Sequence, residues 1–353
     1  MDDVSPPLGI VEGYFGKPWS WDERAHVVRT LAPHGYSRFI YAPKGDAHLR
    51  RDWTVPHDPS EAAAIGSFAK LCQQLGVEFG IGLTPFELHA DWNAAGRRKL
   101  IERTGRLLDL GAVHIALLFD DMRGDFADLA AVQADMAAAV AETHQVRMSI
   151  CPSYYSDDPV LDRVFGHRPK NYLQDLGRGL PDEVGLFWTG PEVCSREISV
   201  GHMDRVARQM GRKPLLWDNY PVNDGPRMSN HLHLRGFTGR SGIGALCAGH
   251  FINPALQPNL SLLPAVTLAM AYRQGDTYDY LAATHAAAAL LYPKDVGDAL
   301  MADLLSLQDA GRERLNRERL LQKYAAFDHP AAQEVRQFLQ GYYSTSAEEV
   351  QTQ

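Results

Sequence analysis

The stretch GIVEGYFGKPW, residues 9–19, decides the fold class that the sequence predicts. It begins as a short apolar strand and continues into a loop with Gly13, Gly16 and three aromatic residues. A doubly wound nucleotide-binding sheet would carry a G-x-G-x-x-G turn at this place, and that turn is absent. The loop is suited instead to bring backbone groups and aromatic rings to the wall of a pocket.

Runs of strand length recur along the chain, with helical patterns between and after them. The predicted strands are residues 9–14, 38–43, 77–83, 114–120, 145–152, 184–190, 214–220 and 245–253. The clearest helical patterns, with apolar residues three and four apart, are at residues 22–32, 60–75, 94–110, 125–143 and 261–272. Strands that alternate with helices indicate a parallel sheet, and eight such strands close a barrel.

The strand signal stops at about residue 273, and amphipathic helices are predicted at 296–307 and 315–327. We therefore predict an α/β fold with two parts. Residues 1–273 form a (β/α)8 TIM barrel, and residues 274–353 form a C-terminal α-helical region.

Composition narrows the class of protein and of partner. The 353 residues are 45% hydrophobic and 22% charged, which is typical of a globular protein. A formal charge of −8 argues against nucleic acid and against an anionic membrane surface as partners. The chain has no apolar run of membrane-spanning length, and residues 1–13 lack a signal-peptide pattern, so we expect a cytoplasmic protein. The four cysteines lie far apart and are interpreted as buried thiols.

Polar and aromatic residues gather where the predicted strands end, which is where TIM barrels build their active sites. They are Glu12, Gly13, Lys44, Asp46, Thr84, Glu87, Asp120, Asp121, Tyr154, Tyr155, Trp188, Thr189, Trp217, Asn219, Asp224 and Asn253. Carboxylates, amides and aromatic faces together suit a neutral sugar, whose hydroxyls need hydrogen bonds and whose C–H face stacks on rings.

The pair Asp120–Asp121 ends the apolar run HIALLFDDM, residues 114–122. Two carboxylates at a buried strand end repel each other and lose hydration, so a catalytic role is favoured over a helix N-cap. Neighbouring residues of one strand point to opposite sides, which suits the acid and nucleophile of a standard retaining glycosidase poorly. In substrate-assisted hydrolysis, one carboxylate orients the 2-acetamido group of the sugar and a second protonates the leaving oxygen. A contiguous pair meets that need.

Seven motifs in this order, VEGYFGKPW, YAPKGD, LLFDD, CPSYY, FWTG, LLWDNYPVND and FINPA, resemble glycoside hydrolase family 84, the β-N-acetylglucosaminidases. The resemblance runs from about residue 9 to residue 272. It implies that Asp120 holds the acetamido N–H and supports an oxazoline intermediate, and that Asp121 is the general acid and then the general base.

The resemblance also implies the residues that bind the sugar. Tyr155 would hydrogen-bond the acetamido oxygen, although Tyr154 beside it could take that role. Many relatives have an acid where this chain has Tyr154. Trp217 would form the wall beside the acetamido methyl group. The pyranose ring and its hydroxyls would be held by Gly13 through its carbonyl, Lys44, Asn219, Asp224 and Asn253.

The sequence thus predicts a retaining exo-β-N-acetylglucosaminidase that works without cofactor, on terminal β-linked GlcNAc of a glycan or glycoprotein. His231 and His233 lack a third ligand, so no metal is assigned. An endo-acting hyaluronidase-like glycosidase and a GlcNAc-binding barrel without turnover remain the alternatives. The C-terminal helices are a candidate surface for a homodimer. The natural substrate stays open between O-GlcNAc protein, cell-wall fragments and oligosaccharides.

Overall fold

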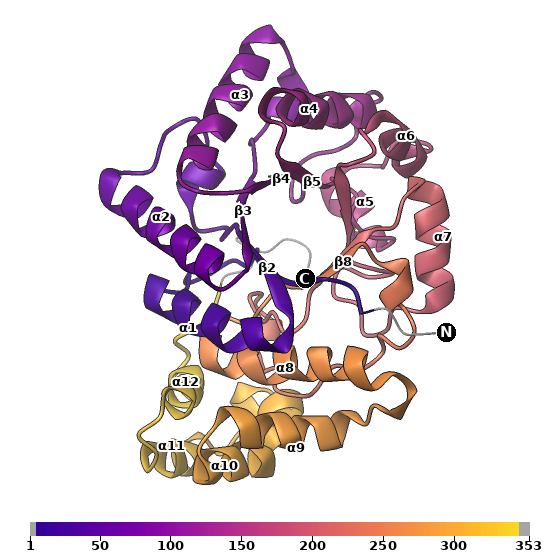
Figure 1. Ribbon diagram of the computed structural model, residues 1–353. Coiled ribbons are helices and arrows are strands. Elements are labelled where there is room, and N and C mark those ends of the chain that lie inside the picture. The colour runs from indigo at the N-terminus through magenta and orange to yellow at the C-terminus, as the bar shows by residue number, and fades with distance from the viewer. Residues whose placement is uncertain (1–4, 346–353) are drawn as a thin grey trace.

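A closed barrel of parallel strands forms the centre of the molecule (Figure 1). The structure is a computed structural model that describes residues 5–345. Each strand pairs with its neighbour in sequence, and β1 pairs with β8, which closes the sheet. The strands are β1 (Leu8–Glu12), β2 (Tyr36–Tyr41), β3 (Glu78–Leu83), β4 (His114–Leu118), β5 (Arg147–Cys151), β6 (Gly185–Trp188), β7 (Leu215–Asp218) and β8 (Gly249–Ile252).

The predicted TIM barrel is confirmed, and every observed strand overlaps one of the predicted ranges. Most of the strands end earlier than predicted. β4 ends at Leu118 and not at Asp120, and β7 ends at Asp218 and not at Tyr220. The polar residues that follow these strands therefore lie in loops, where their side chains are not bound to the alternation of a strand.

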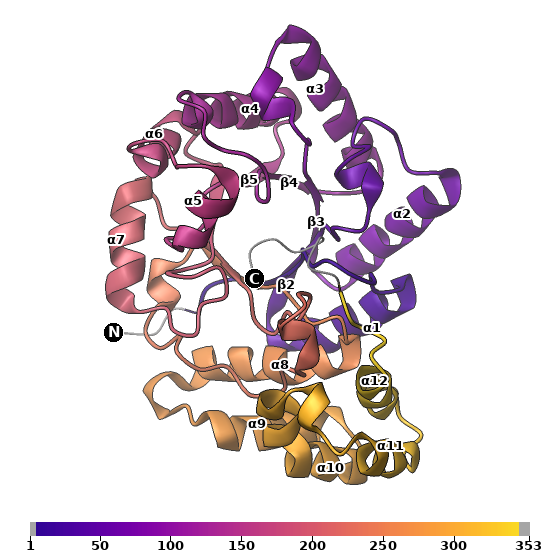
Figure 2. The same ribbon diagram turned by 180° about the vertical axis from the view of Figure 1, so that it is seen from behind.

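Helices form the layer outside the barrel (Figure 2). They are α1 (Trp21–Leu31), α2 (Pro59–Gln74), α3 (Ala94–Asp109), α4 (Leu129–His144), α5 (Pro159–Phe165), α6 (Tyr172–Gly179), α7 (Val200–Met210) and α8 (Pro258–Gln274). The sequence patterns predicted α1 to α4 and α8 but not the three between them. α5 and α6 span only 7 and 8 residues, which is short for a helical pattern. α7 does carry such a pattern, because its buried residues Met203, Val206 and Met210 are spaced three and four apart, and it was overlooked.

Aromatic side chains fill part of the barrel interior and support the end where the strands finish. The ring of Phe187 in β6 meets the rings of Phe251 and Trp217 edge to face, at centroid distances of 5.3 and 5.4 Å. All three side chains are buried. Trp217 therefore has a fixed position at the top of the core, because the rings below it leave little room for movement.

Four more helices pack outside α8 on one side of the barrel (Figure 1). They are α9 (Tyr280–Leu291), α10 (Lys294–Leu305), α11 (Arg317–Ala325) and α12 (Pro330–Leu339). The predicted helices at 296–307 and 315–327 correspond to α10 and α11, whereas α9 and α12 were not named. Leu300, Tyr324 and Phe338 belong to the same continuous apolar core as the barrel strands.

A buried carboxylate joins this helical region to the barrel. The N-cap residue of α8, Gln257, gives the helix no side-chain cap. Glu334 of α12 takes that place, because its carboxylate accepts hydrogen bonds from the backbone N–H groups of Asn259 and Leu260, each at 2.9 Å. These are two of the N-terminal donors that an α-helix leaves unpaired, and a negative charge there also suits the helix dipole.

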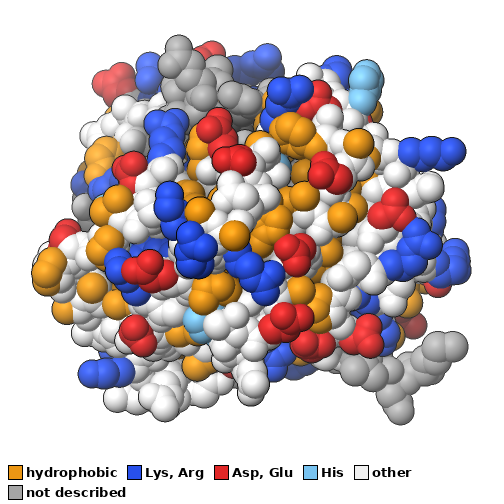
Figure 3. All heavy atoms as spheres, turned by 90° about the horizontal axis from the view of Figure 1, so that it is seen from above, with side chains coloured by type: hydrophobic (Ala, Val, Ile, Leu, Met, Phe, Trp, Pro, Cys, Tyr) orange, Lys and Arg blue, Asp and Glu red, His pale blue; other side chains and the backbone are white. Residues whose placement is uncertain are grey.

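Basic and acidic side chains are interspersed over the surface seen from above (Figure 3), as is usual for a globular protein. Among residues 5–345, none of the helices combines the length and the apolar character needed to cross a bilayer.

We expect Glu334→Ala to lower the free energy of unfolding by about 1–3 kcal/mol, because it leaves buried N–H groups of α8 without an acceptor. Equilibrium unfolding in urea measures this change. Glu318→Ala, which removes an exposed carboxylate from α11, is the control. Equal stability of the two variants would show that Glu334 does not cap α8.

Candidate active site

One pocket at the carboxyl ends of the strands gathers all nine residues to which the family resemblance assigns a role. Gly13 follows β1, Lys44 follows β2, and the aspartate pair follows β4. Trp217 lies in β7, and the remaining members follow β5, β7 and β8 and are Tyr155, Asn219, Asp224 and Asn253. The lining is completed by Phe15, Cys151, Thr189, Val193, Cys194 and Val222.

Asp120 and Asp121 both face Lys44. The backbone of Asp121 is left-handed, with φ of 58°, a conformation that Asp tolerates better than most residues. The expectation that the two side chains point to opposite sides is therefore wrong, because the strand has already ended and the chain turns at Asp121. The Nζ of Lys44 donates a hydrogen bond to Oδ2 of Asp120 and lies 3.7 Å from Oδ2 of Asp121.

The charges in this group affect the two acids differently. Burial raises the pKa of Asp121, and the charge of Asp120 raises it further, although Lys44 lowers it in part. Burial lowers the pKa of Lys44, but the two carboxylates outweigh this effect, so its pKa is raised and the ammonium stays charged. Lys44 contacts Asp120 directly, whereas Asp121 is the acid whose pKa is raised, so the two neighbouring carboxyls lie in different electrostatic surroundings.

One carboxylate oxygen of Asp120 has no hydrogen-bond partner among the described residues. Its side chain is buried, and Oδ1 accepts no hydrogen bond from any residue that the structure describes. A buried carboxylate oxygen without a donor costs free energy, so such an atom in a pocket indicates a ligand that supplies an N–H or O–H group.

Tyr155 and Tyr154 take different places. Tyr155 lines the pocket, and its phenol makes no hydrogen bond within residues 5–345. Burial raises the pKa of Tyr155 well above 10, and the two aspartates add to this, so the phenol remains a neutral donor. Tyr154 lies outside this pocket, where its hydroxyl donates to the carbonyl of Gly166 at 2.6 Å. Of the two alternatives that the sequence left, Tyr155 is the one that reaches the site.

A chain of amide hydrogen bonds holds the far wall. The N–H of Gly13 donates to Oδ1 of Asn253 at 3.2 Å, and Nδ2 of Asn253 donates to Oδ1 of Asn219 at 3.0 Å. The indole N–H of Trp217 donates to the same Oδ1 at 3.0 Å. Nδ2 of Asn219 in turn donates to the carbonyl of Val193 at 2.8 Å. Loops that follow β1, β6, β7 and β8 are thereby fixed relative to one another.

Asp224 lies beside the loop quoted at the start of the sequence analysis. Its Oδ2 accepts a hydrogen bond from the backbone N–H of Phe15 at 2.8 Å, and burial raises its pKa to about 6. The hydroxyl of Thr345 donates to its backbone carbonyl, and the nearby Lys17 contacts the ring of Tyr342. The end of the helical region thus reaches the rim of the pocket.

Six other strand-end residues named from the sequence lie outside the pocket: Glu12, Asp46, Thr84, Glu87, Tyr154 and Trp188. Glu12 forms a buried ion pair with Arg24 at 2.7 Å, and Asp46 pairs with His57 at 2.9 Å. Their polar groups are used to hold the scaffold. Thr189, in contrast, lines the pocket.

Sequence reasoning missed Phe15, Cys151, Cys194 and Arg50. Phe15 lies in the quoted loop, and its backbone contact with Asp224 has no signal in the sequence. Cys151 is a buried thiol as interpreted, whereas Cys194 is partly exposed. The guanidinium of Arg50 lies 5.2 Å from the ring centre of Phe15 and lowers the pKa of Asp121. A lone arginine in a loop does not reveal such a position.

Within residues 5–345, no three His, Cys, Asp or Glu side chains form a group that could hold a metal ion. Nδ1 of His231 lies 2.9 Å from the carbonyl of Gln308, and Nδ1 of His233 lies 3.0 Å from that of Pro221.

A family model described as beta-N-acetylglucosaminidase matches residues 8–304. The chain belongs to this family, glycoside hydrolase family 84. The predicted membership of a glycoside hydrolase family is confirmed.

Curated relatives and a solved structure agree with this assignment. The chain is 27% identical over 243 residues to Protein O-GlcNAcase from Mus musculus and to that from Rattus norvegicus, over 66% of its own length. The aligned part is 26% of each relative, so the chain spans about a quarter of their length. Its structure is similar to that of a mutant O-GlcNAc hydrolase from Thermobaculum terrenum, with a TM-score of 0.82 and 25% identity, covering 96% of this chain and 82% of the other.

We expect Gly13→Ala to destabilise the protein by about 1–3 kcal/mol, because overpacking forces a buried neighbour to move. A Cβ at residue 13 would lie 2.3 Å from the ring of Trp217. Urea unfolding measures the loss, and tryptophan fluorescence reports the displaced ring. Gly201→Ala in α7 is the control, because nothing lies within 4 Å of a Cβ there. If both substitutions leave stability unchanged, the contact between Gly13 and Trp217 does not restrict residue 13.

Proposed function

We propose that this chain is a retaining exo-β-N-acetylglucosaminidase that uses the 2-acetamido group of its substrate as the nucleophile. The observation that carries this proposal is the buried Oδ1 of Asp120, which accepts no hydrogen bond from the described residues and lies in the same pocket as Asp121. A 2-acetamido N–H supplies the missing donor. The raised pKa of Asp121 supports the role of proton donor to the glycosidic oxygen.

In the first step, the acetamido oxygen attacks the anomeric carbon and forms a new C–O bond. The bond between the anomeric carbon and the leaving oxygen breaks, and Asp121 gives its proton to that oxygen. The nitrogen of the resulting oxazoline keeps its hydrogen bond to Asp120, whose charge stabilises the positive charge that develops on the ring. Tyr155 donates its phenol proton to a hydrogen bond with the acetamido oxygen and holds it in line for attack.

In the second step, Asp121 takes a proton from water, and the water oxygen attacks the anomeric carbon. The oxazoline C–O bond breaks, and the acetamido group is restored. Two inversions at one carbon retain the β configuration. Asp121 is protonated again at the end, so the enzyme returns to its starting state.

The remaining pocket residues would bind the sugar. Trp217, whose ring is held by Gly13 and Phe187, forms a flat wall for the acetamido methyl group. The carbonyl of Gly13 and the side chains of Lys44, Asn219, Asp224 and Asn253, which line the pocket, would bind the ring hydroxyls. Asp224 would favour exo cleavage, because its carboxylate lies in the pocket wall beside Phe15, where it would meet a hydroxyl of a terminal sugar.

GlcNAc linked to protein is the substrate that the relatives favour, since their names are Protein O-GlcNAcase and O-GlcNAc hydrolase. Release of GlcNAc from an O-GlcNAc peptide, compared with chitobiose and a muropeptide, tests it. Release of oligosaccharides from hyaluronan would favour the endo-acting alternative, and binding of GlcNAc without turnover would favour the non-catalytic one.

We also propose that residues 1–273 form the catalytic barrel and residues 274–353 a helical unit attached to it. The protein would form a homodimer through these helices and would be located in the cytoplasm. Light scattering measures the oligomeric state, and a monomer at working concentration would contradict the dimer.

Substitution of the two aspartates should reduce activity with different dependence on the leaving group. We expect Asp121→Asn to lose about 10²–10⁴-fold in kcat/KM on an alkyl β-GlcNAc glycoside and much less on a 4-nitrophenyl one, because only the poor leaving group needs the proton. Asp120→Asn should lose activity on both, since the oxazoline loses its support. Steady-state kinetics on the two glycosides measures this, with Asp52→Asn, an exposed carboxylate, as the control. Equal losses of Asp121→Asn on both substrates, or a near-normal rate of Asp120→Asn, would contradict these roles.

The dependence of kcat/KM on pH should be bell-shaped. Asp121 must be protonated at the start, so activity falls as the pH rises through its raised pKa. The acetamido N–H needs a carboxylate as its acceptor, so activity falls again in acid. Arg50→Met should move the alkaline limb to higher pH, because Arg50 lowers the pKa of Asp121. Rates on a GlcNAc glycoside measured from about pH 4 to 9 check this. A flat profile, or a limb that moves to lower pH in Arg50→Met, would count against Asp121 as the acid.

A further inference from the structure

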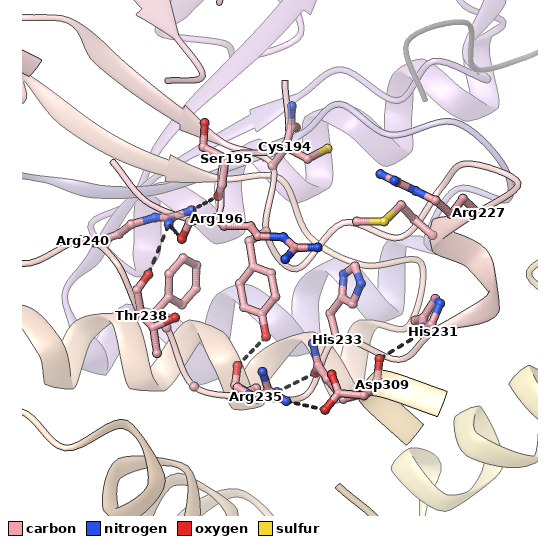
Figure 4. Close-up of a pocket in the computed structure, with 16 residues that line it drawn as sticks. Cys194, Ser195, Arg196, Arg227, His231, His233, Arg235, Thr238, Arg240 and Asp309 are labelled. Carbon is pink, nitrogen blue, oxygen red and sulfur yellow. Dashed lines mark hydrogen bonds and ion pairs between the residues drawn. The ribbon is translucent and has the colours of Figure 1, made fainter. Parts of the chain in front are cut away.

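Two further spaces adjoin the active-site pocket at different residues. One is a cavity of about 490 Å³ that shares Cys194 and Asn219 with the pocket (Figure 4). The other is a groove of about 670 Å³ that shares Asp121 with it. In the proposed mechanism Asn219 binds ring hydroxyls, whereas Asp121 protonates the leaving oxygen. The groove, and not the cavity, therefore adjoins the pocket on the leaving-group side.

The aglycone of a glycoside begins at the oxygen that the general acid protonates. The carboxyl of Asp121 must come within hydrogen-bond distance of that oxygen, so the first atoms of the aglycone lie beside Asp121. The groove is lined by this residue and by the two that follow it in the chain, Met122 and Arg123. It is therefore the space into which an aglycone extends from the proposed acid.

Apolar side chains from two loops and one helix line the groove. They are Phe86 from the loop after β3, Met122 and Phe126 from the loop after β4, and Val164 and Phe165 from α5. Met122 and Phe165 are buried, whereas the other three are half-buried. A ligand that covers half-buried apolar side chains removes them from water, which favours binding.

Contacts between the walls hold the groove in shape. The ring of His89 meets the ring of Phe126 edge to face at 5.7 Å, and its Nε2 lies 2.8 Å from the carbonyl of Arg123. The N–H of Gly124 donates to the carbonyl of Phe165 at 2.9 Å, which joins the loop after β4 to α5. Burial lowers the pKa of His89, so its ring is uncharged at neutral pH. A ligand would thus meet a largely preformed apolar surface.

The charged side chains at the groove disfavour an anionic ligand. The guanidinium of Arg123 is paired with the carboxylate of Asp125, through a hydrogen bond of 3.1 Å between Nη2 and Oδ2. Glu87 and Asp91 are exposed acids of the lining. An anionic aglycone would therefore meet mainly carboxylates.

We propose that this groove is an aglycone subsite for an apolar side chain of a peptide, next to the glycosylated serine or threonine. The inference rests on the proposed function, in which GlcNAc on protein is the substrate. A sugar in this place would need partners for its hydroxyls, whereas Arg123 and His89 are already paired within the walls. Phe86 and Phe126 would cover the apolar side chain. The enzyme would then hydrolyse sites with an apolar neighbour faster than sites with a small or acidic one.

The test compares short O-GlcNAc peptides that are capped at both ends. One has alanine on both sides of the glycosylated serine, and the others have phenylalanine before it, phenylalanine after it, or aspartate on both sides. The leaving oxygen is a serine oxygen in every peptide, so the need for protonation is the same. The quantity measured is kcat/KM on each peptide relative to the alanine peptide. We expect a ratio of about 10 for the better phenylalanine peptide, since burial of a phenyl ring supplies at least that factor. The ratio for aspartate should be below 1.

Phe86→Ser and Phe126→Ser should each lower the phenylalanine ratio by about threefold or more, because each removes one of the accessible rings. Phe126→Leu should keep most of the ratio, since it retains an apolar side chain. The matched control is Phe327→Ser, which removes a half-buried phenylalanine that follows α11 and lines neither the pocket nor the groove. Its ratio should equal that of the unmodified protein. Circular dichroism of each variant checks that the fold is kept.

The outcomes separate this inference from the proposed function. Equal rates on the alanine and phenylalanine peptides overturn the subsite and leave the proposed function intact. A preference for phenylalanine that persists in Phe86→Ser and Phe126→Ser also overturns it, because the apolar contact then lies elsewhere. Release of GlcNAc from a 4-nitrophenyl glycoside but from none of the peptides shows that the aglycone is not a peptide. No release from any of these substrates overturns the proposed function, and the subsite with it.

Discussion

The contact of one lysine ammonium with two neighbouring carboxylates is the interaction on which this site depends. Two buried acids repel each other and lose hydration, and Lys44 compensates for one of those charges by direct contact with Asp120. The same burial raises the pKa of Asp121. One cation thus gives two chemically identical side chains different surroundings. The barrel makes the contact possible, because residues 76 positions apart in the chain meet where β2 and β4 end.

Residues of strand β7 and of the loop after it line the sugar pocket and hold the wall of a neighbouring cavity that Arg196 and Arg240 line. Trp217 and Asn219 line the pocket, whereas Asp218 between them turns to Arg240 and to His250, at 2.7 and 3.0 Å. Successive side chains at a strand end point to opposite sides, which produces this division. Arg240 then holds the backbone that carries Arg196. The pocket and the neighbouring cavity lined by Arg196 and Arg240 are therefore built on adjacent residues.

Two groups of contacts from the helical region bear on the start of α8 and on the rim of the pocket. Glu334 accepts the hydrogen bonds at the start of α8, and Tyr342 and Thr345 contact the loops that carry Lys17 and Asp224. Because Asp224 also accepts a hydrogen bond from the N–H of Phe15, the rim of the pocket is connected to the segment that follows α12. The stability of this region and the shape of the pocket are thus connected by hydrogen bonds.

The sequence by itself determined the barrel, since eight apolar runs between helices have few other ways to bury their surface. It also indicated the positions in the pocket, because residues just after parallel strands meet at one edge of the sheet.

Only the tertiary structure decided which side chains reach the pocket and which groups they contact there. It separated Tyr155 from Tyr154, brought both aspartates to Lys44 through a left-handed turn at Asp121, and turned Glu12 and Asp46 into parts of the scaffold. It also brought Phe86, Phe126 and Phe165 to one groove. Loop residues have no periodicity, so which of them meet depends on how the loops pack, and only the folded chain shows that.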